Sequence, residues 1–329
     1  MPNRLMFSAG FALLVLGSTA CRLEAQTRPE GTFERTLAVV GPVTLDIRTG
    51  SGSIEIHSGP VNSVRIVGRV RGGRSWFFDD DDDVEERIRQ IEEAPPITQN
   101  GDAVRVGPVD SDRLYRNISI SYDVTVPMET RLQSRTGSGS QTITGLSGPV
   151  DVSTGSGGVT LRGIQRDVRA STGSGSMQIE DVGSFIGRTG SGGITASAVR
   201  GAVDARSGSG HIDVKQTGEA DVSVVTGSGG IDVTGAHRAV HARAGSGTIE
   251  IEGRPAGNWD VETGSGGIRI DFPEDSAFDL NVRTGSGSIN TTHPLALLAA
   301  ISRNRVQGTV RGGGARVDLS TGSGSVHIE

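Results

Sequence analysis

Apolar and polar side chains alternate in short runs along most of this chain, and a glycine-rich tetrapeptide separates successive runs. The stretch Val150–Leu161, "VDVSTGSGGVTL", shows the pattern, with apolar side chains at every second residue on both sides of Thr-Gly-Ser-Gly. Alternation with a period of two is typical of a β-strand that buries one face. Each unit therefore predicts a strand, a tight turn, a second strand and a looser turn.

Gly-Ser-Gly occurs eleven times, and from Gly137 to Gly264 successive motifs begin 18, 18, 17, 18, 19, 18 and 19 residues apart. Such a fixed period indicates stacked structural repeats. A chain of hairpins needs no constant register, whereas a parallel solenoid stacks equivalent residues about 4.8 Å apart and favours one residue type at each corner. We therefore predict an all-β, parallel β-solenoid (β-helix or β-roll-like), with two strands in each coil of about 18 residues.

The residue before Gly-Ser-Gly is threonine in nine repeats, and Ser207 and Ala244 replace it in the other two. Because this position shares the parity of the apolar residues, we expect its side chain to point inward, while the motif serine can bond to its counterpart in the next coil. The last two motifs are 37 residues apart, which predicts one degenerate or looped coil around His293–Arg311. The nine threonines are Thr49, Thr136, Thr154, Thr172, Thr189, Thr226, Thr263, Thr284 and Thr321.

A segment of different composition separates the first two motifs. An acidic run, Asp79–Asp83, precedes an apolar-periodic stretch that ends before two prolines, and this predicts a helix over Val84–Glu93 capped by Asp82 or Asp83. Strands are predicted at Ala103–Val106 and Ile118–Val126. We accordingly divide the chain into residues 1–25 (signal peptide and linker), 26–130 (β-rich, with a helical insertion at roughly residues 71–100) and 131–329 (repetitive solenoid).

The amino-terminal residues carry the pattern of an export signal. Arg4 precedes an apolar stretch from Leu5 to Leu16, and small residues follow up to Ala20. Cys21, which is the only cysteine, comes next, so no disulfide can form within the chain. The sequence leaves two alternatives open: lipidation of Cys21, or ordinary cleavage after Ala20 or Ala25. Either alternative predicts a protein of the cell envelope, in the periplasm or at the cell surface.

With these residues in hand, the sequence resembles the bacterial β-strand-repeat putative adhesins, a family built on a domain of unknown function. The resemblance covers roughly Thr32–Glu329 and rests on the "TGSG" corners, on "ISISYDVTVPMETRLQSRTGSGSQTITG" and on "VQGTVRGGGARVDLSTGSGSVHIE". It implies a β-solenoid in an envelope setting, and it implies no particular activity.

The residues offer little support for catalysis or metal binding. A calcium-binding β-roll needs Gly-Gly-x-Gly-x-Asp twice per coil, which this repeat lacks. The six histidines are scattered, and His237 and His241 lack the helical face of a zinc pair. A net charge of -6 gives no reason to expect nucleic acid as a partner. We therefore predict no catalytic residue, no cofactor and no metal ligand.

One outward-facing row of arginines is a candidate site. Six of the eleven coils carry arginine directly before the corner residue, and two of these, Arg188 and Arg206, lie in consecutive coils. Their guanidinium groups are predicted to stack closely enough to share a carboxylate or phosphate of an anionic glycan. The alternative, which the sequence favours, is a self-neutralising ladder of surface ion pairs with aspartates two residues earlier in their coils, such as Asp204.

Together these features predict an exported, non-enzymatic scaffold or adhesion and interaction module. An extended repeat surface suits a polysaccharide or an envelope or surface protein as partner. We expect contact with the membrane only if Cys21 is lipidated, through that lipid anchor. The alternative is a carbohydrate-active β-helix enzyme, with a lyase-like or hydrolase-like groove.

Overall fold

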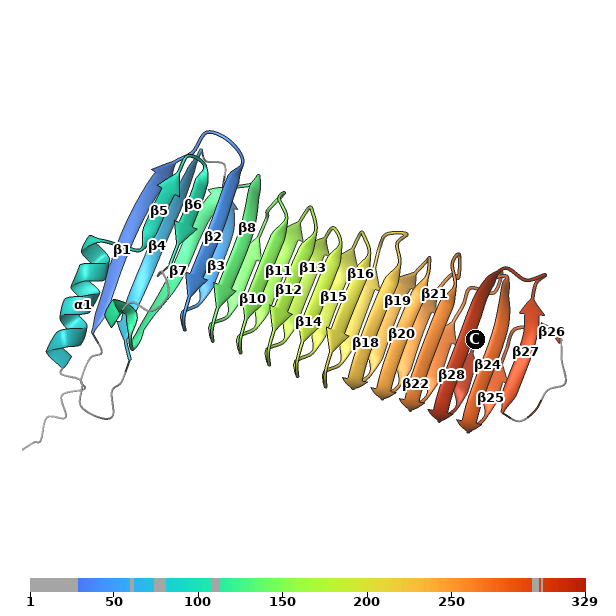
Figure 1. The fold of residues 1–329 in the computed structure, drawn as a ribbon. Coiled ribbons are helices and arrows are strands. Elements are labelled where there is room, and N and C mark those ends of the chain that lie inside the picture. The colour runs from blue at the N-terminus through green and yellow to red at the C-terminus, as the bar shows by residue number, and fades with distance from the viewer. Residues whose placement is uncertain (1–28, 60–61, 74–80, 108–112, 298–301, 303) are drawn as a thin grey trace, which may run out of the picture.

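A computed structural model of the chain shows a long rod built from two facing sheets (Figure 1). It describes residues 29–59, 62–73, 81–107, 113–297, 302 and 304–329. The predicted export signal, Cys21, Asp79 and Asp80 lie outside the described residues. Within the described ranges there is no helix long and apolar enough to cross a membrane.

Sheet A has fourteen strands and forms one wall of the rod. In spatial order from the amino-terminal end, the strands of sheet A are β1 (Glu30–Ala38), β4 (Ser63–Gly72), β7 (Ile118–Pro127), β3 (Ile54–Gly59), β9 (Gln141–Thr144), β11 (Val159–Ile164), β13 (Met177–Val182), β15 (Ile194–Val199), β17 (Ile212–Gln216), β19 (Ile231–Ala236), β21 (Ile249–Gly253), β23 (Ile268–Asp271), β29 (Val326–Ile328) and β25 (Ile289–Thr291).

Sheet B has fifteen strands and forms the opposite wall. From the same end, the strands of sheet B are β5 (Ile97–Asn100), β6 (Ala103–Val106), β2 (Val43–Thr49), β8 (Thr130–Thr136), β10 (Val150–Thr154), β12 (Val168–Thr172), β14 (Phe185–Thr189), β16 (Val203–Ser207), β18 (Val222–Ser228), β20 (Val240–Ser246), β22 (Trp259–Ser265), β28 (Ala315–Ser323), β24 (Phe278–Ser286), β27 (Arg305–Val310) and β26 (Leu295–Leu297).

The strand register confirms the predicted parallel solenoid. β10 pairs in parallel with β8 and β12, and Thr154 lies between Thr136 and Thr172. One strand of each coil belongs to sheet B and the next to sheet A, so the two inward faces meet in one continuous apolar core. β2 also pairs with β8 in sheet B, and β3 pairs with β9 in sheet A, so both sheets continue without a break across residue 130.

The threonine corner is buried, as predicted, and it links neighbouring coils. The Thr154 hydroxyl donates to the carbonyl of Gly139 in the preceding coil (3.0 Å) and accepts from the amide of Gly157 (3.1 Å). All nine corner threonines are buried, and Ser207 makes the same two bonds. The motif serines are exposed instead, so the hydroxyl that joins the coils belongs to the threonine and not to the serine.

The amino-terminal end differs from the regular coils. The antiparallel strands β1, β4 and β7 close this end of sheet A, and α1 (Asp81–Glu93) packs on β1 and β4 through Val84, Ile88 and Ile91. The helix begins three residues earlier than predicted, so Asp82 and Asp83 lie in its first turn and do not cap it. The carboxylate of Asp83 in that turn favours the positive end of the helix. A short 3-10 helix, η1 (Arg113–Tyr115), precedes β7.

The degenerate or looped coil predicted around His293–Arg311 is an antiparallel excursion from the regular coils. Its described residues include β26 and β27, which pair antiparallel with each other; β27 also pairs antiparallel with β24, so the two strands close the other end of sheet B. β28 and β29 then return between the coil of β22 and β23 and the coil of β24 and β25 (Figure 1). An equivalent insertion occurs near the amino-terminal end, where β2 and β3 lie between β6–β7 and β8–β9.

Candidate interaction surface

The outward face of sheet B carries a shallow trough that runs across the strands. Four cavities of about 760, 460, 320 and 440 Å³ follow one another from β2 to β22. Neighbouring cavities share lining residues: Arg131 and Asp167 link the first two, Asp151 and Arg169 the second and third, and Ile186 the third and fourth. A stack of nine strands spans about 40 Å at the usual strand spacing.

Small residues where the strands of sheet B begin explain why the trough is hollow. Gly148 and Pro149 lie directly before β10 and line the first cavity, and Ser184, Ala202 and Ala239 occupy similar places along the fourth. Because these side chains are short, the outward surface of sheet B is lower at these positions than around them. Longer side chains, such as Arg131 and Asp167, stand on either side of the dip.

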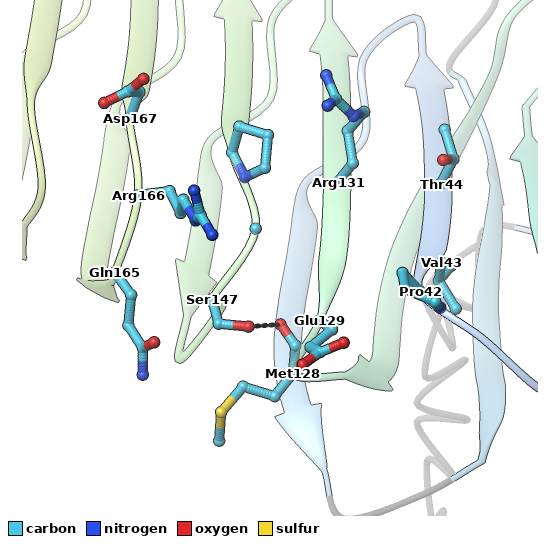
Figure 2. Close-up of a pocket in the computed structure, with 12 residues that line it drawn as sticks. Pro42, Val43, Thr44, Met128, Glu129, Arg131, Ser147, Gln165, Arg166 and Asp167 are labelled. Atoms are coloured by element: carbon cyan, nitrogen blue, oxygen red, sulfur yellow. Dashed lines mark hydrogen bonds between the residues drawn. The ribbon is translucent and has the colours of Figure 1, made fainter.

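The first cavity is lined by charges of both signs that do not pair with each other (Figure 2). Arg131 projects from β8, and Arg166 and Asp167 come from the turn before β12. Among the described residues, the side chains of these three, and those of Glu129 and Arg169, have no hydrogen bond or ion pair. Arg169 lies beside Asp151 in the register, also without an ion pair. The cavity thus presents free donors and free acceptors to solvent.

The two arginines predicted from the sequence are placed side by side, in register on β14 and β16. One carboxylate already lies between them: Asp204 is 3.5 Å from the Arg188 Nη2 atom and 3.0 Å from the Arg206 Nε atom. Two other arginines of the row also form ion pairs, Arg48 with Asp46 and Arg243 with Asp260. This part of the row is therefore the ion-pair ladder that the sequence offered as the alternative.

The unpaired arginines of the trough were missed by sequence reasoning. Arg131 and Arg169 lie at other strand positions than the aligned row, and Arg166 lies in a turn of irregular sequence. No shared spacing marks the three as a set. Whether an arginine is paired depends on its neighbour in the next coil, which the repeat alone does not show.

The side chains whose pKa values are shifted belong to surface ion pairs or to the core. Arg254 donates to both carboxylate oxygens of Asp275 (2.7 and 3.1 Å), and this hydrogen bonding lowers the pKa of Asp275. Burial raises the pKa of the Tyr122 hydroxyl above its usual value of 10.0, and its ring lies 6.3 Å from that of Phe33. Both features lie away from the trough and support packing or surface structure.

A second cluster of carboxylates lies on sheet A. Asp232, Glu250, Glu252 and Asp271 line a cavity of about 190 Å³ with Arg269. Glu250, Glu252 and Asp271 are exposed, whereas a glycosidase acid relies on burial to raise its pKa. In the described part of the chain, no group of three or more His, Cys, Asp or Glu could hold a metal ion. His237 and His241 are not brought together as ligands, and His241 lies 3.2 Å from Asp260.

A family model described as Toastrack DUF4097 matches residues 117–329, which is well over half of the chain. The chain belongs to this family. The Toastrack match confirms the resemblance found in the sequence, although it begins later than Thr32. No curated protein matches the chain.

Three solved structures are similar to this chain, and each match covers 91% of it. A "putative cell adhesion protein" from Clostridium sporogenes is 11% identical over 99% of its own length, with a TM-score of 0.18. A "putative lipid binding protein" from Parabacteroides distasonis is 11% identical over 96%, with a TM-score of 0.37. A "putative adhesin" from Bacteroides fragilis is 9% identical over 97%, with a TM-score of 0.31. At such low identities and TM-scores, they carry no argument about this Toastrack protein.

Proposed function

We propose that this protein is an exported, non-enzymatic interaction module of the cell envelope, and that the trough on sheet B binds an extended polysaccharide. The observation that carries the proposal is the run of linked cavities lined by unpaired Arg131, Arg166 and Arg169 together with unpaired Glu129, Asp151 and Asp167. A sugar hydroxyl both donates and accepts hydrogen bonds, so it can satisfy guanidinium donors and carboxylate acceptors at once. A purely anionic polymer would satisfy only the arginines.

The shape of the trough supports a polymer over a small molecule. Small-molecule sites are mostly enclosed and apolar, with a few polar groups. Here the hollows are shallow and open to solvent, carry charged side chains beside apolar surface, and are joined across several coils. A linear ligand lying across the strands would contact each coil in turn, and many weak contacts would add up along its length.

The binding proposal predicts a clear difference between two pairs of arginines. In a glycan array of neutral and anionic polysaccharides, Arg131→Ala/Arg169→Ala should lower binding of the retained glycan about tenfold or more, because each change removes a charge-assisted donor. Arg188→Ala/Arg206→Ala should lower it less, since Asp204 already engages both side chains. Arg162→Ala is the matched control, because Arg162 pairs with Glu180 on sheet A.

Two outcomes would contradict the binding proposal. One is an array on which no glycan binds above the level of a denatured sample. The other is equal loss in the trough variant and in Arg162→Ala, which would indicate a general effect of surface charge. If the protein bound another envelope protein and no glycan, its partner would be a protein and not a polysaccharide.

The envelope setting has its own test, and Cys21 decides between the two alternatives for the leader. If Cys21 is lipidated, the wild-type protein will fractionate with membranes and Cys21→Ala will become soluble outside the cytoplasm. If both fractionate as soluble, the lipid anchor is wrong and ordinary cleavage replaces it. If the wild-type protein stays in the cytoplasm, export itself is wrong.

A further inference from the structure

The coil made by β28 and β29 is enclosed on both sides by residues that precede it in the sequence. β28 pairs with β22 and with β24, and β29 pairs with β23 and with β25 (Figure 1). In a simple solenoid each new coil is added at the open end and contacts one earlier coil. Here a later segment fills a place one coil wide between two coils formed earlier in the sequence.

Hydrogen bonds at the corner cross this coil from one side to the other. The Thr321 hydroxyl donates to the Gly266 carbonyl (2.9 Å), and the Thr284 hydroxyl donates to the Gly324 carbonyl (2.9 Å). In the backbone, the amide of Gly266 donates to the Ser323 carbonyl (3.0 Å). The hydrogen bonds of the corner threonines therefore connect the coil of β24 and β25 to the rest of the rod through β28.

The inserted segment also supplies core side chains to both neighbours. Val317, Leu319, Val326 and Ile328 are each at most 1% exposed. β24 is hydrogen-bonded to β28 and β27, and β25 to β29, and sheet pairing places neither strand beside β22 or β23. Without the inserted coil, residues 278–310 would lose the strands that join them to the rod.

We propose that Ala315–Glu329 is a locking segment, and that the place between the coils of β22–β23 and β24–β25 is a binding slot for it. The slot recognises two strands joined by a Thr-Gly-Ser-Gly corner, with apolar side chains at alternating positions. Filling the slot fixes β24, β25 and β27 onto the rod. Because β24 and β27 precede the lock in the chain, folding of this end completes only after the lock has entered.

The first test compares hydrogen exchange in the full chain and in a chain ending at Gly314. We expect amides of β24, β25 and β27 to exchange more than about tenfold faster in the shortened chain, while β18 to β21 keep their protection. A synthetic peptide of residues 315–329 should restore the lost protection, and the same peptide with Leu319→Asp should not. Unchanged protection of β24, β25 and β27 in the shortened chain would overturn the proposal.

A second test applies even if the shortened chain does not fold. Gly312 lies in the turn between β27 and β28, and the space around it is open, since an added Cβ atom would meet nothing within 4 Å, so a protease site inserted after it should be tolerated. After the folded full-length protein is cut there, the fragment of β28 and β29 should remain bound through gel filtration in native buffer. Release of the fragment without denaturant would show that it is an appendage and not a lock.

Discussion

Gly157→Ala is expected to destabilise the protein by about 3–5 kcal/mol, at the upper end of single-substitution effects. Gly157 is the second glycine of its corner, and an added Cβ atom would lie 1.9 Å from the Gly139 carbonyl oxygen in the preceding coil. Two stacked backbones separated by a normal strand spacing leave no room for a methyl group there. The coils would have to move apart and stretch the Thr154 hydrogen bonds. Urea unfolding, followed by circular dichroism, measures the loss.

The adjacent glycine is the matched control for this substitution. In Gly158→Ala the added Cβ atom would lie no closer than 3.5 Å to any atom, the nearest being the Ser176 carbonyl oxygen, which is an ordinary contact. The corresponding position in neighbouring coils already carries Ser140 and Ser176. We expect a change within about 0.5 kcal/mol. Similar losses for both variants would mean that the corners are not stacked as described.

Gly187→Ala is expected to cost about 2–3 kcal/mol, and a second substitution should rescue it. The Phe185 ring lies over Gly187 inside the rod, and an added Cβ atom would lie 2.4 Å from the ring Cζ atom. The coils on both sides carry valine and alanine at these two positions, Val168 with Ala170 and Val203 with Ala205. The large Phe185 ring thus fits inside β14's coil because residue 187 is glycine and has no side chain.

The rescue is measured as a double-mutant cycle by chemical denaturation. Phe185→Val alone leaves a cavity and should cost about 2–4 kcal/mol. Phe185→Val/Gly187→Ala recreates the valine and alanine of both neighbouring coils, so it should be more stable than the sum of the single losses predicts, by at least about 1 kcal/mol. Additive losses would show that the ring and the glycine do not share one space.

Much of the fold could be predicted from the sequence because the repeat determines the buried face and the register of each coil. The parity of Val150, Val152 and Thr154 with the apolar side chains determines which face is buried, and the constant spacing determines the register. Both were confirmed. The order of the coils could not be predicted in the same way. β22, β24 and β28 carry the same corner and the same alternation, so the pattern allows each of them beside either of the others.

The candidate site was less predictable than the fold. The sequence indicates which arginines face outward, and it placed Arg188 and Arg206 next to each other, where they lie. It also offered aspartates such as Asp204 as partners of this row, as the structure shows. It did not show that Arg131, Arg166 and Arg169 would have no partner. Pairing on this face depends on side chains from neighbouring coils and turns, where the repeat is least regular.

The affinity of the protein for glycan oligomers of increasing length tests the central claim most directly. Oligomers of the polysaccharide retained on the array would be titrated calorimetrically into the wild-type protein. If the ligand lies along the trough, Kd should fall steadily with length and become constant once the oligomer spans about 40 Å. In Arg131→Ala/Arg169→Ala the fall should be shallower. An equal Kd for the shortest and the longest oligomers would contradict an extended binding surface on sheet B.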